Sequence, residues 1–186
     1  MPHRSNDIAR WERISVEPET DYTVMRVHRE VRRHAADGRT GTFTIASAPL
    51  WVNIVPVTGD NQIILVEQFR HGTAEVTLEV PGGIAALHED PRLAAERECR
   101  EETGWYSPEP AVLIGKTDAN PAFMSNQCFT YLWRNCADTG MQNLDALEDI
   151  SVRLVAEKEL FSLIQRGLVR HSLVLSAVTH YLMHKN

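Results

Sequence analysis

The stretch from Gly83 to Trp105 constrains this chain more than any other, because it crowds five glutamates and three arginines into little more than one helix. Asp90 is a favourable N-cap, and Pro91 suits the first helical position, where a missing N–H costs no hydrogen bond. Gly104 suits the left-handed residue that commonly ends a helix. The sequence therefore predicts a helix over about 91–103.

The carboxylates of this predicted helix are concentrated on one side. Glu98 precedes Glu101 by three residues and Glu102 by four, so the three side chains are neighbours on the helix surface. Ala94 and Ala95 share that half, which indicates that it faces protein. Charged helix faces are usually solvated and held by ion pairs, but carboxylates held together beside protein repel one another unless a cation lies between them. Their hard oxygens suit Mg²⁺, with Mn²⁺ as an alternative.

The spacing of the charged residues distinguishes these two interpretations. Five residues separate Gly83 from Glu89, and seven more precede Arg97. The stretch resembles the Nudix box, G-x5-E-x7-R-E-U-x-E-E-x-G-U, in which U is a bulky apolar residue, filled here by Cys99 and Trp105. At average residue frequencies such a match arises by chance on the order of once in 10⁸ windows, so the resemblance outweighs the solvated-face interpretation. The strict positions that match are Gly83, Glu89, Arg97, Glu98, Glu101, Glu102 and Gly104.

The resemblance implies an α/β protein with the Nudix fold, which is an α/β/α sandwich around a mixed β-sheet. We expect residues 46–186 to form this Nudix hydrolase domain and residues 1–45 to form an N-terminal β extension. In the branch described below, homodimers are common and N-terminal strands reach across to the partner subunit, so the extension is a candidate dimer-forming segment. Four box residues are implied to be structural, two of them as an ion pair: Gly83, Gly104, and Arg97 with Glu89.

Outside the box, strand-like and helix-like segments follow one another as this fold requires. The continuous apolar run at 63–66 predicts a strand buried on both faces, and Pro56 indicates an edge strand or a bulge. Gly167 is expected to end the first of two C-terminal helices. The predicted strands are 22–31, 42–46, 51–57, 62–70, 76–83, 110–117, 128–133 and 150–155, and the predicted C-terminal helices are about 157–166 and 172–184.

Composition excludes several classes of function. The chain has 186 residues, enough for one large core, and a net charge of −6, which disfavours nucleic-acid binding because phosphate backbones attract basic surfaces. Its three cysteines form no C-x-x-C pair, which is typical of free thiols in a reducing compartment. The first residues lack the apolar run of a leader peptide, and no segment has the roughly 18 apolar residues of a membrane span. We therefore expect a cytoplasmic protein that binds neither membranes nor nucleic acid.

The segments before the box narrow the resemblance. The runs EQFR (67–70) and LEVPGG (78–83) are similar to the Q-[YF]-R and E-[LIV]-P-[AG]-G patterns of the ADP-ribose and nucleoside-diphosphate-sugar pyrophosphatase branch. This similarity implies that Arg70 binds the phosphates or the terminal sugar of a substrate, and a surface ion pair is the alternative. A backbone carbonyl at Gly82 can join the helix carboxylates around a metal ion. Pro121 follows the box at the distance at which the branch carries a proline, and it is a candidate substrate-binding residue.

Two further residues are candidates. Glu148 lies in a Leu-Glu-Asp-Ile run that is similar to an E-D-I motif of that branch, where glutamates supply the general base or a further metal ligand. Some members carry another glutamate two residues earlier, where this chain has Ala146, so Glu148 stays open as base, metal ligand or loop acid. Trp11 is either a core aromatic, the usual place for a large ring, or a substrate-binding residue that stacks on the base.

Together these resemblances imply Mg²⁺-dependent hydrolysis of the diphosphate bond of ADP-ribose or a nucleoside-diphosphate sugar, giving a nucleoside monophosphate and a sugar phosphate. Cations bound by Glu98, Glu101 and Glu102 are expected to neutralise phosphate charge and activate water, with Glu148 as base and Glu101 also counted as catalytic. A different nucleotide substrate, such as a modified nucleoside triphosphate, a dinucleoside polyphosphate or a coenzyme, is the alternative within the family. A non-catalytic binding module is the third possibility, disfavoured because the box is intact.

Overall fold

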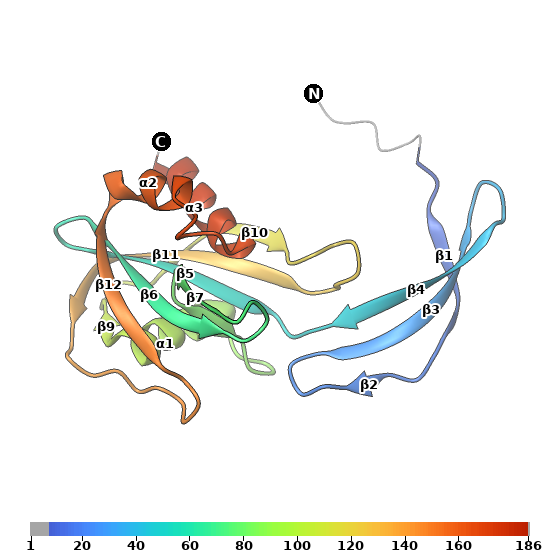
Figure 1. The fold of residues 1–186 in the computed structure, drawn as a ribbon, viewed down its shortest axis with the longest axis horizontal. Coiled ribbons are helices and arrows are strands. Elements are labelled where there is room, and N and C mark those ends of the chain that lie inside the picture. The colour runs from blue at the N-terminus through green and yellow to red at the C-terminus, as the bar shows by residue number, and fades with distance from the viewer. Residues whose placement is uncertain (1–7, 186) are drawn as a thin grey trace. The chain divides into compact units, whose positions relative to one another are not determined.

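The computed structural model describes residues 8–185, which divide into two compact units (Figure 1). Unit 1 holds the residues up to Pro49 together with Asp118–Asn126, and unit 2 holds Leu50–Thr117 and the residues from Gln127 onward. The sequence-based division after residue 45 stays a prediction about domains. The compact units have different boundaries, since unit 1 extends to Pro49 and also includes the segment 118–126.

Unit 1 is built on a four-stranded antiparallel sheet in which β3 pairs along one edge with β1 and β2 and along the other edge with β4. The segment from 118–126 is fastened to β4, since Ala46 N donates to Phe123 O at 2.8 Å and Ser125 N donates to Ala46 O at 3.1 Å. The strands are β1 (Trp11–Val16), β2 (Thr20–Asp21), β3 (Arg26–His34) and β4 (Thr40–Ser47).

The strand predicted at 22–31 begins later than expected, at Arg26. Asp21 Oδ1 accepts a hydrogen bond from Thr23 N at 2.7 Å, and Thr23 has a φ of 70°. An aspartate that bonds the backbone two residues onward favours a turn over continued strand. This local turn separates β2 from β3, which the β-branched composition of the segment did not reveal.

Unit 2 contains an eight-stranded mixed sheet with the main order β10-β11-β5-β6-β12. β5 and β11 are parallel, whereas β6 is antiparallel to β12 and to β7. The run at 63–66 is fully buried, as predicted. The strands are β5 (Trp51–Thr58), β6 (Gln62–Arg70), β7 (Glu75–Glu79), β8 (Gly82–Ile84), β9 (Trp105–Tyr106), β10 (Val112–Asp118), β11 (Gln127–Asp138) and β12 (Ile150–Ala156).

The prediction of a single strand at 76–83 is wrong, because the structure has two strands there. β7 pairs with β6, whereas β8 pairs with β5, where Asn53 is opposite Gly82. Pro81 lies between them and its carbonyl accepts from Ile54 N at 3.0 Å. Since proline has no N–H to continue a ladder, the chain changes partner strand at this residue. That change places the two glycines that follow Pro81 in β8, beside the box helix.

Pro56 lies in a central strand, so the edge alternative is wrong. Its partner in β11 is Trp133, and the register of β5 with β11 shifts directly afterwards, before Cys136. Asn135, inside that irregularity, has a φ of 57°. A bulge therefore lies beside Pro56, but its one extra residue is on the partner strand β11 rather than on Pro56's own strand, where it was predicted.

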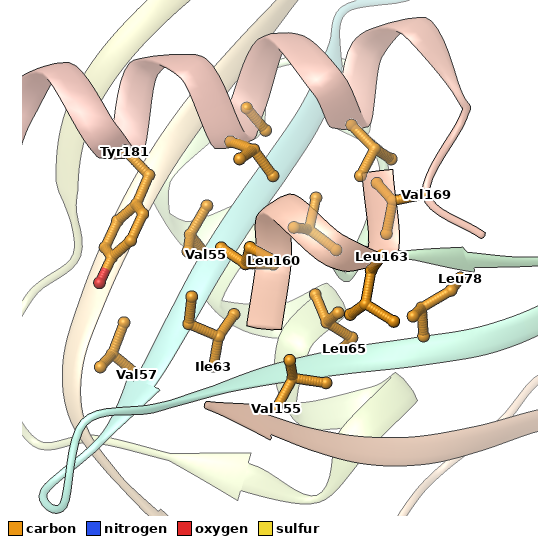
Figure 2. Close-up of a cluster of buried hydrophobic side chains, with 14 of the residues drawn as sticks. Val55, Val57, Ile63, Leu65, Leu78, Val155, Leu160, Leu163, Val169 and Tyr181 are labelled. Carbon is orange, nitrogen blue, oxygen red and sulfur yellow. The ribbon is translucent and has the colours of Figure 1, made fainter. Parts of the chain in front are cut away.

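Helices cover both faces of the unit 2 sheet. Side chains of β5 and β6 alternate between the faces, as the two-residue period of a strand requires. One core lies beneath the C-terminal helices and joins Val55, Ile63 and Leu65 to Leu160 and Tyr181 (Figure 2). The other lies against the box helix. The helices are α1 (Pro91–Thr103), the short 3-10 segment η2 (Glu157–Glu159), α2 (Leu160–Gln165) and α3 (Ser172–Lys185).

This layering is the predicted α/β/α sandwich around a mixed sheet (Figure 1). The face of α1 that meets the sheet is made of small residues. Ala94, Ala95 and Cys99 are fully buried there against Ile54 and Ile64. Small side chains let the helix backbone approach the sheet closely. The neighbouring glutamates are thereby placed against β8. Within residues 8–185, no helix combines the length and the apolar composition needed to cross a membrane.

The ends of α1 follow the sequence prediction. Asp90 Oδ1 accepts hydrogen bonds from Arg92 N at 2.9 Å and Leu93 N at 3.2 Å, which satisfies two of the free N–H groups of the first turn. Gly104 has a φ of 74° and its N–H donates to Arg100 O at 2.9 Å. The helix is therefore fixed at both ends, and the glutamates of its last turn are held in register.

We predict that Gly104→Ala destabilises the protein more than Gly140→Ala. Both glycines have a φ of 74°, but a Cβ on Gly104 would lie 3.0 Å from the Met141 backbone, whereas a Cβ on Gly140 would meet nothing within 4 Å. The left-handed conformation alone costs a side-chain-bearing residue about 1–2 kcal/mol. We expect Gly140→Ala to lose about that much free energy of unfolding in urea and Gly104→Ala clearly more. Equal losses would contradict the contact with residue 141.

Candidate functional site

The carboxylates of α1 meet the glycines of β8. Glu102 is 3 % exposed, and its Oε2 accepts a hydrogen bond from Gly82 N at 3.0 Å. A Cβ on Gly83 would lie 2.6 Å from Glu98 Oε1, closer than side-chain atoms pack. A side chain at residue 83 would therefore displace the Glu98 carboxylate, and glycine lets the strand lie against it. Gly82 and Gly83 form one wall of the candidate site, and Glu98 and Glu102 form the other.

Arg97 neutralises the remaining acids of the box. Its Nε and Nη2 donate to the two oxygens of Glu89 at 2.9 and 3.1 Å, and its Nη1 donates to Glu98 at 3.0 Å and to Glu101 at 2.9 Å. Nη2 also donates to Ile84 O at 3.3 Å. One guanidinium thus joins the loop before α1 to two glutamates of the helix. These contacts raise the pKa of Arg97, chiefly through Glu89, and they lower the pKa of Glu89.

Burial and like charges make the site carboxylates reluctant to ionise. The pKa of Glu102 is raised to about 8, chiefly by burial and then by the charges of Glu98 and Glu148. The hydrogen bond from Gly82 acts in the opposite direction and lowers this pKa. Burial likewise raises the pKa of Glu98, which Arg97 partly offsets. A carboxylate that is hard to ionise in the protein alone is one whose charged form gains from a cation placed beside it.

The loop between β11 and β12 brings Glu148 to these acids. Glu148 lies on the exposed part of the loop and its Oε2 accepts from Asp145 N at 3.0 Å. The same charge that disfavours ionisation of Glu98 and Glu102 also contributes to raising the pKa of Arg70, after the larger effect of Glu79. The loop acid, the helix acids and the arginine of β6 therefore share one electrostatic environment.

The other end of this loop is tied to the C-terminus of α1. Gln142 Nε2 donates to Glu102 O at 2.5 Å and to Ile150 O at 3.2 Å, and Asn143 N donates to Glu101 O at 2.9 Å. These bonds satisfy helix carbonyls that have no partner within the helix. Next to them lies a cavity of about 410 Å³ whose lining includes Arg97 and Arg100. Gln142 and this cavity were not foreseen in the sequence, since a glutamine in an acidic loop carries no motif.

The donor set fits a hard divalent cation by its chemistry, although the side chains do not converge on one point. Among residues 8–185, no three carboxylate, imidazole or thiol groups lie close enough to enclose a metal ion. Glu98 and Glu101 are instead engaged by Arg97. The glutamates that would hold Mg²⁺ or Mn²⁺ are Glu98, Glu101 and Glu102, and the first two would have to turn from Arg97 to do so. The ligand roles of these residues and of the Gly82 carbonyl stay predictions.

Arg70 makes a two-pronged ion pair with Glu79. Arg70 Nε and Nη2 donate to Glu79 Oε1 and Oε2 at 2.9 and 2.8 Å, while Thr77 Oγ1 donates to Oε1 at 2.6 Å. His171 Nδ1 lies 3.0 Å from Oε2. Burial alone would raise the pKa of Glu79, but the bonds from Arg70, His171 and Thr77 hold that pKa well below its usual range. The Arg70 side chain is still 43 % exposed, so the predicted contact with substrate stays compatible with the ion pair.

Two predicted substrate-binding residues belong to unit 1. Trp11 is half-buried, with its ring 5.2 Å from that of Phe43 in an edge contact and 5.1 Å from that of His34. Arg39 lies over its face at 5.5 Å. Pro121 is exposed in the turn between β10 and β11. Trp11 packs against neighbouring rings without being fully buried, and the substrate roles of Trp11 and Pro121 stay predictions.

The comparison with protein families decides the assignment. The profile described as the NUDIX domain matches residues 49–175, more than half of the chain. The chain belongs to the Nudix family. This confirms the resemblance carried by the box.

The individual relatives align with only about half of this chain. A methanol dehydrogenase activator of Bacillus methanolicus is 38 % identical over 78 residues, 42 % of each chain. An ADP-ribose pyrophosphatase of Bacillus subtilis (strain 168) is 30 % identical over 96 residues, 52 % of this chain and 51 % of that one. The matched part thus spans about half the length of these curated relatives. A crystal structure titled as an ADP compounds hydrolase superposes with a TM-score of 0.83 over 96 % of both chains at 18 % identity, which confirms the predicted Nudix fold.

We predict that Glu79 makes folding stability depend on acid. Its pKa is lower in the folded protein than in the unfolded chain, so its contribution is complete above the unfolded pKa of about 4.5 and is lost as pH falls below that value. Urea unfolding between about pH 6 and pH 3 should show a steeper loss for the wild type than for Glu79→Gln. Parallel curves for the two proteins would contradict an ionised Glu79 in the folded state.

Proposed function

We propose that this Nudix protein hydrolyses the diphosphate bond of ADP-ribose or a nucleoside-diphosphate sugar with a divalent cation, most simply Mg²⁺. The observation that carries the proposal is the meeting of Glu98 and Glu102 with the two glycines of β8, beside a loop acid and an arginine. A diphosphate needs both positive charge and a group that accepts a proton from attacking water. The similarity to an ADP-ribose pyrophosphatase supports this substrate class.

In this proposal the residues divide the work. Arg70 binds the substrate phosphates or terminal sugar through the part of its guanidinium that Glu79 does not use. Glu148, on the exposed part of the acidic loop before β12, accepts the proton of the attacking water. Glu98, Glu101 and Glu102 hold the cation, which when bound supplies neutralisation of phosphate charge and activation of water. Arg97 then keeps Glu89 and the start of α1 in place.

The direct test is product identification with ADP-ribose, GDP-mannose, UDP-glucose and 8-oxo-dGTP in the presence of Mg²⁺. We expect AMP and ribose 5-phosphate, or the corresponding monophosphate and sugar phosphate, from the first three. Glu148→Gln should lower kcat by at least about 10²-fold, the lower end of a general base's contribution. Asp149→Asn, one residue away, serves as the matched control and should retain activity. The absence of turnover of any compound would contradict the proposal. A fully active Glu148→Gln variant would show that another residue is the general base.

A second candidate function is suggested by the relative named as a methanol dehydrogenase activator. In that case the protein would act on a dehydrogenase, either by binding it or by hydrolysing a diphosphate that it carries as coenzyme. Adding wild type and Glu102→Gln to a methanol dehydrogenase assay distinguishes the cases. Stimulation by wild type alone would indicate hydrolysis of the coenzyme, whereas stimulation by both would indicate a binding role.

We also propose that the protein is a homodimer formed through unit 1, and that it works in the cytoplasm. Unit 1 exposes several large apolar side chains on its strands and on the turn between β2 and β3, and the three cysteines of the chain are free and buried, as expected in a reducing compartment. These exposed side chains are Ile14, Val16, Tyr22, Val24 and Phe43.

The predicted dimer has a simple measurement. Light scattering after size exclusion should give twice the 21.0 kDa of one chain. The double variant Ile14→Asp, Val16→Asp should shift the mass to that of a monomer, because charges on an apolar interface are costly to bury. Met183→Asp, at an exposed position of α3, is the control and should stay dimeric. A wild-type mass of one chain at micromolar concentration would contradict the proposal.

A further inference from the structure

The carboxylate of Glu79 receives four side-chain hydrogen bonds from three parts of the fold. Arg70 comes from β6, Thr77 from β7 and His171 from the residue that precedes α3. Glu79 is 2 % exposed, so it is a buried anion whose two oxygens need these donors. The direction of the Arg70 fork depends on where this carboxylate is held.

His171 has the geometry of a donor to Glu79. An ionised carboxylate only accepts hydrogen bonds, so the imidazole must present an N–H at Nδ1, which lies 3.0 Å from Oε2. The imidazole shares Oε2 with Arg70 Nη2, whose bond is 2.8 Å long. Removal of the imidazole would leave that oxygen held by Arg70 alone, and the carboxylate and guanidinium could rotate together.

The backbone around His171 is itself fixed. His171 O accepts from Leu175 N at 2.9 Å in the first turn of α3, and Leu168 O accepts from Leu78 N at 3.4 Å on β7. Arg170 forms an ion pair with Glu75 at the start of β7. The segment before α3 is therefore fastened along the edge of β7, and His171 reaches the buried carboxylate from that edge.

We propose that His171 is a positioning residue that sets the orientation of Arg70 through Glu79, and thereby the affinity for the phosphates of the substrate. This inference rests on the proposed function. Three of the five N–H donors of Arg70 lie outside the fork to Glu79, and they point usefully at a phosphate only when that fork is held. His171 itself contacts the carboxylate, not the substrate.

Steady-state kinetics on ADP-ribose with Mg²⁺ test the proposal. His171→Ala and His171→Gln should raise KM by about tenfold with kcat within about twofold, as expected for loss of a charge-assisted hydrogen bond that acts on binding. His171→Asn should retain most of the wild-type KM, because its amide nitrogen lies close to the position of Nδ1. His184→Ala, at an exposed position near the end of α3, the helix that follows His171, is the matched control and should match the wild type.

Failure of the inference and failure of the proposed function give different results. A wild type without turnover on any diphosphate overturns the proposed function, and the substrate part of the inference with it. With an active wild type, an unchanged KM in His171→Ala, a fall in kcat alone, or equal effects of Asn and Ala would overturn the role of His171. Independently of activity, the Nε–H of Arg70 should exchange with solvent at least about fivefold faster in His171→Ala. An unchanged exchange rate would also overturn the proposal.

Discussion

The sharing of Arg97 among three carboxylates is the interaction on which the site depends. Glu89, Glu98 and Glu101 all bond this guanidinium, so a helix with crowded acids can pack beside a sheet without unopposed charge. The same contacts connect the loop before α1 to the helix itself. Surface ion pairs are individually weak, but a bidentate arginine in a network is one of the stronger forms. The pKa of Glu102, further along the helix, is raised chiefly by the burial of its carboxyl group and then by the charges of Glu98 and Glu148.

The fold turns this charged helix into a platform by closing it against small side chains. Ala94, Ala95 and Cys99 meet the central strands, and the change of strand partner at Pro81 brings Gly82 and Gly83 against the glutamates. The opposite face of the same strands is covered by α2 and α3 (Figure 2). Because β5 and β6 are buried on both faces, the site is built on the most rigid part of unit 2. The acidic loop before β12 is the adjustable part.

The sequence predicted the box helix to its end residues, because Asp90, Pro91 and Gly104 each have one physical role at a helix end. It also predicted most strands of unit 2, where apolar runs are continuous. It failed at Pro81, because a change of partner strand depends on contacts with β5 that lie far away in the chain. For the site, local spacing indicated the three helix glutamates, and the resemblance to the pyrophosphatase branch indicated Glu148. The partnership of Glu79 with His171 spans 92 positions and leaves no periodic signal, so only the structure could bring it out.

The central claim is that the acids of α1 form a divalent cation site, and thermal unfolding tests it directly. A ligand that binds only the folded state raises Tm by an amount that grows with the logarithm of one plus the ratio of free ligand concentration to Kd. The account predicts that Mg²⁺ raises the Tm of the wild type by about 3 °C or more over a sodium salt of equal ionic strength. It predicts little or no such rise for Glu98→Gln combined with Glu102→Gln. Equal Tm values of the wild type in the two salts, at Mg²⁺ concentrations up to about 10 mM, would contradict the account.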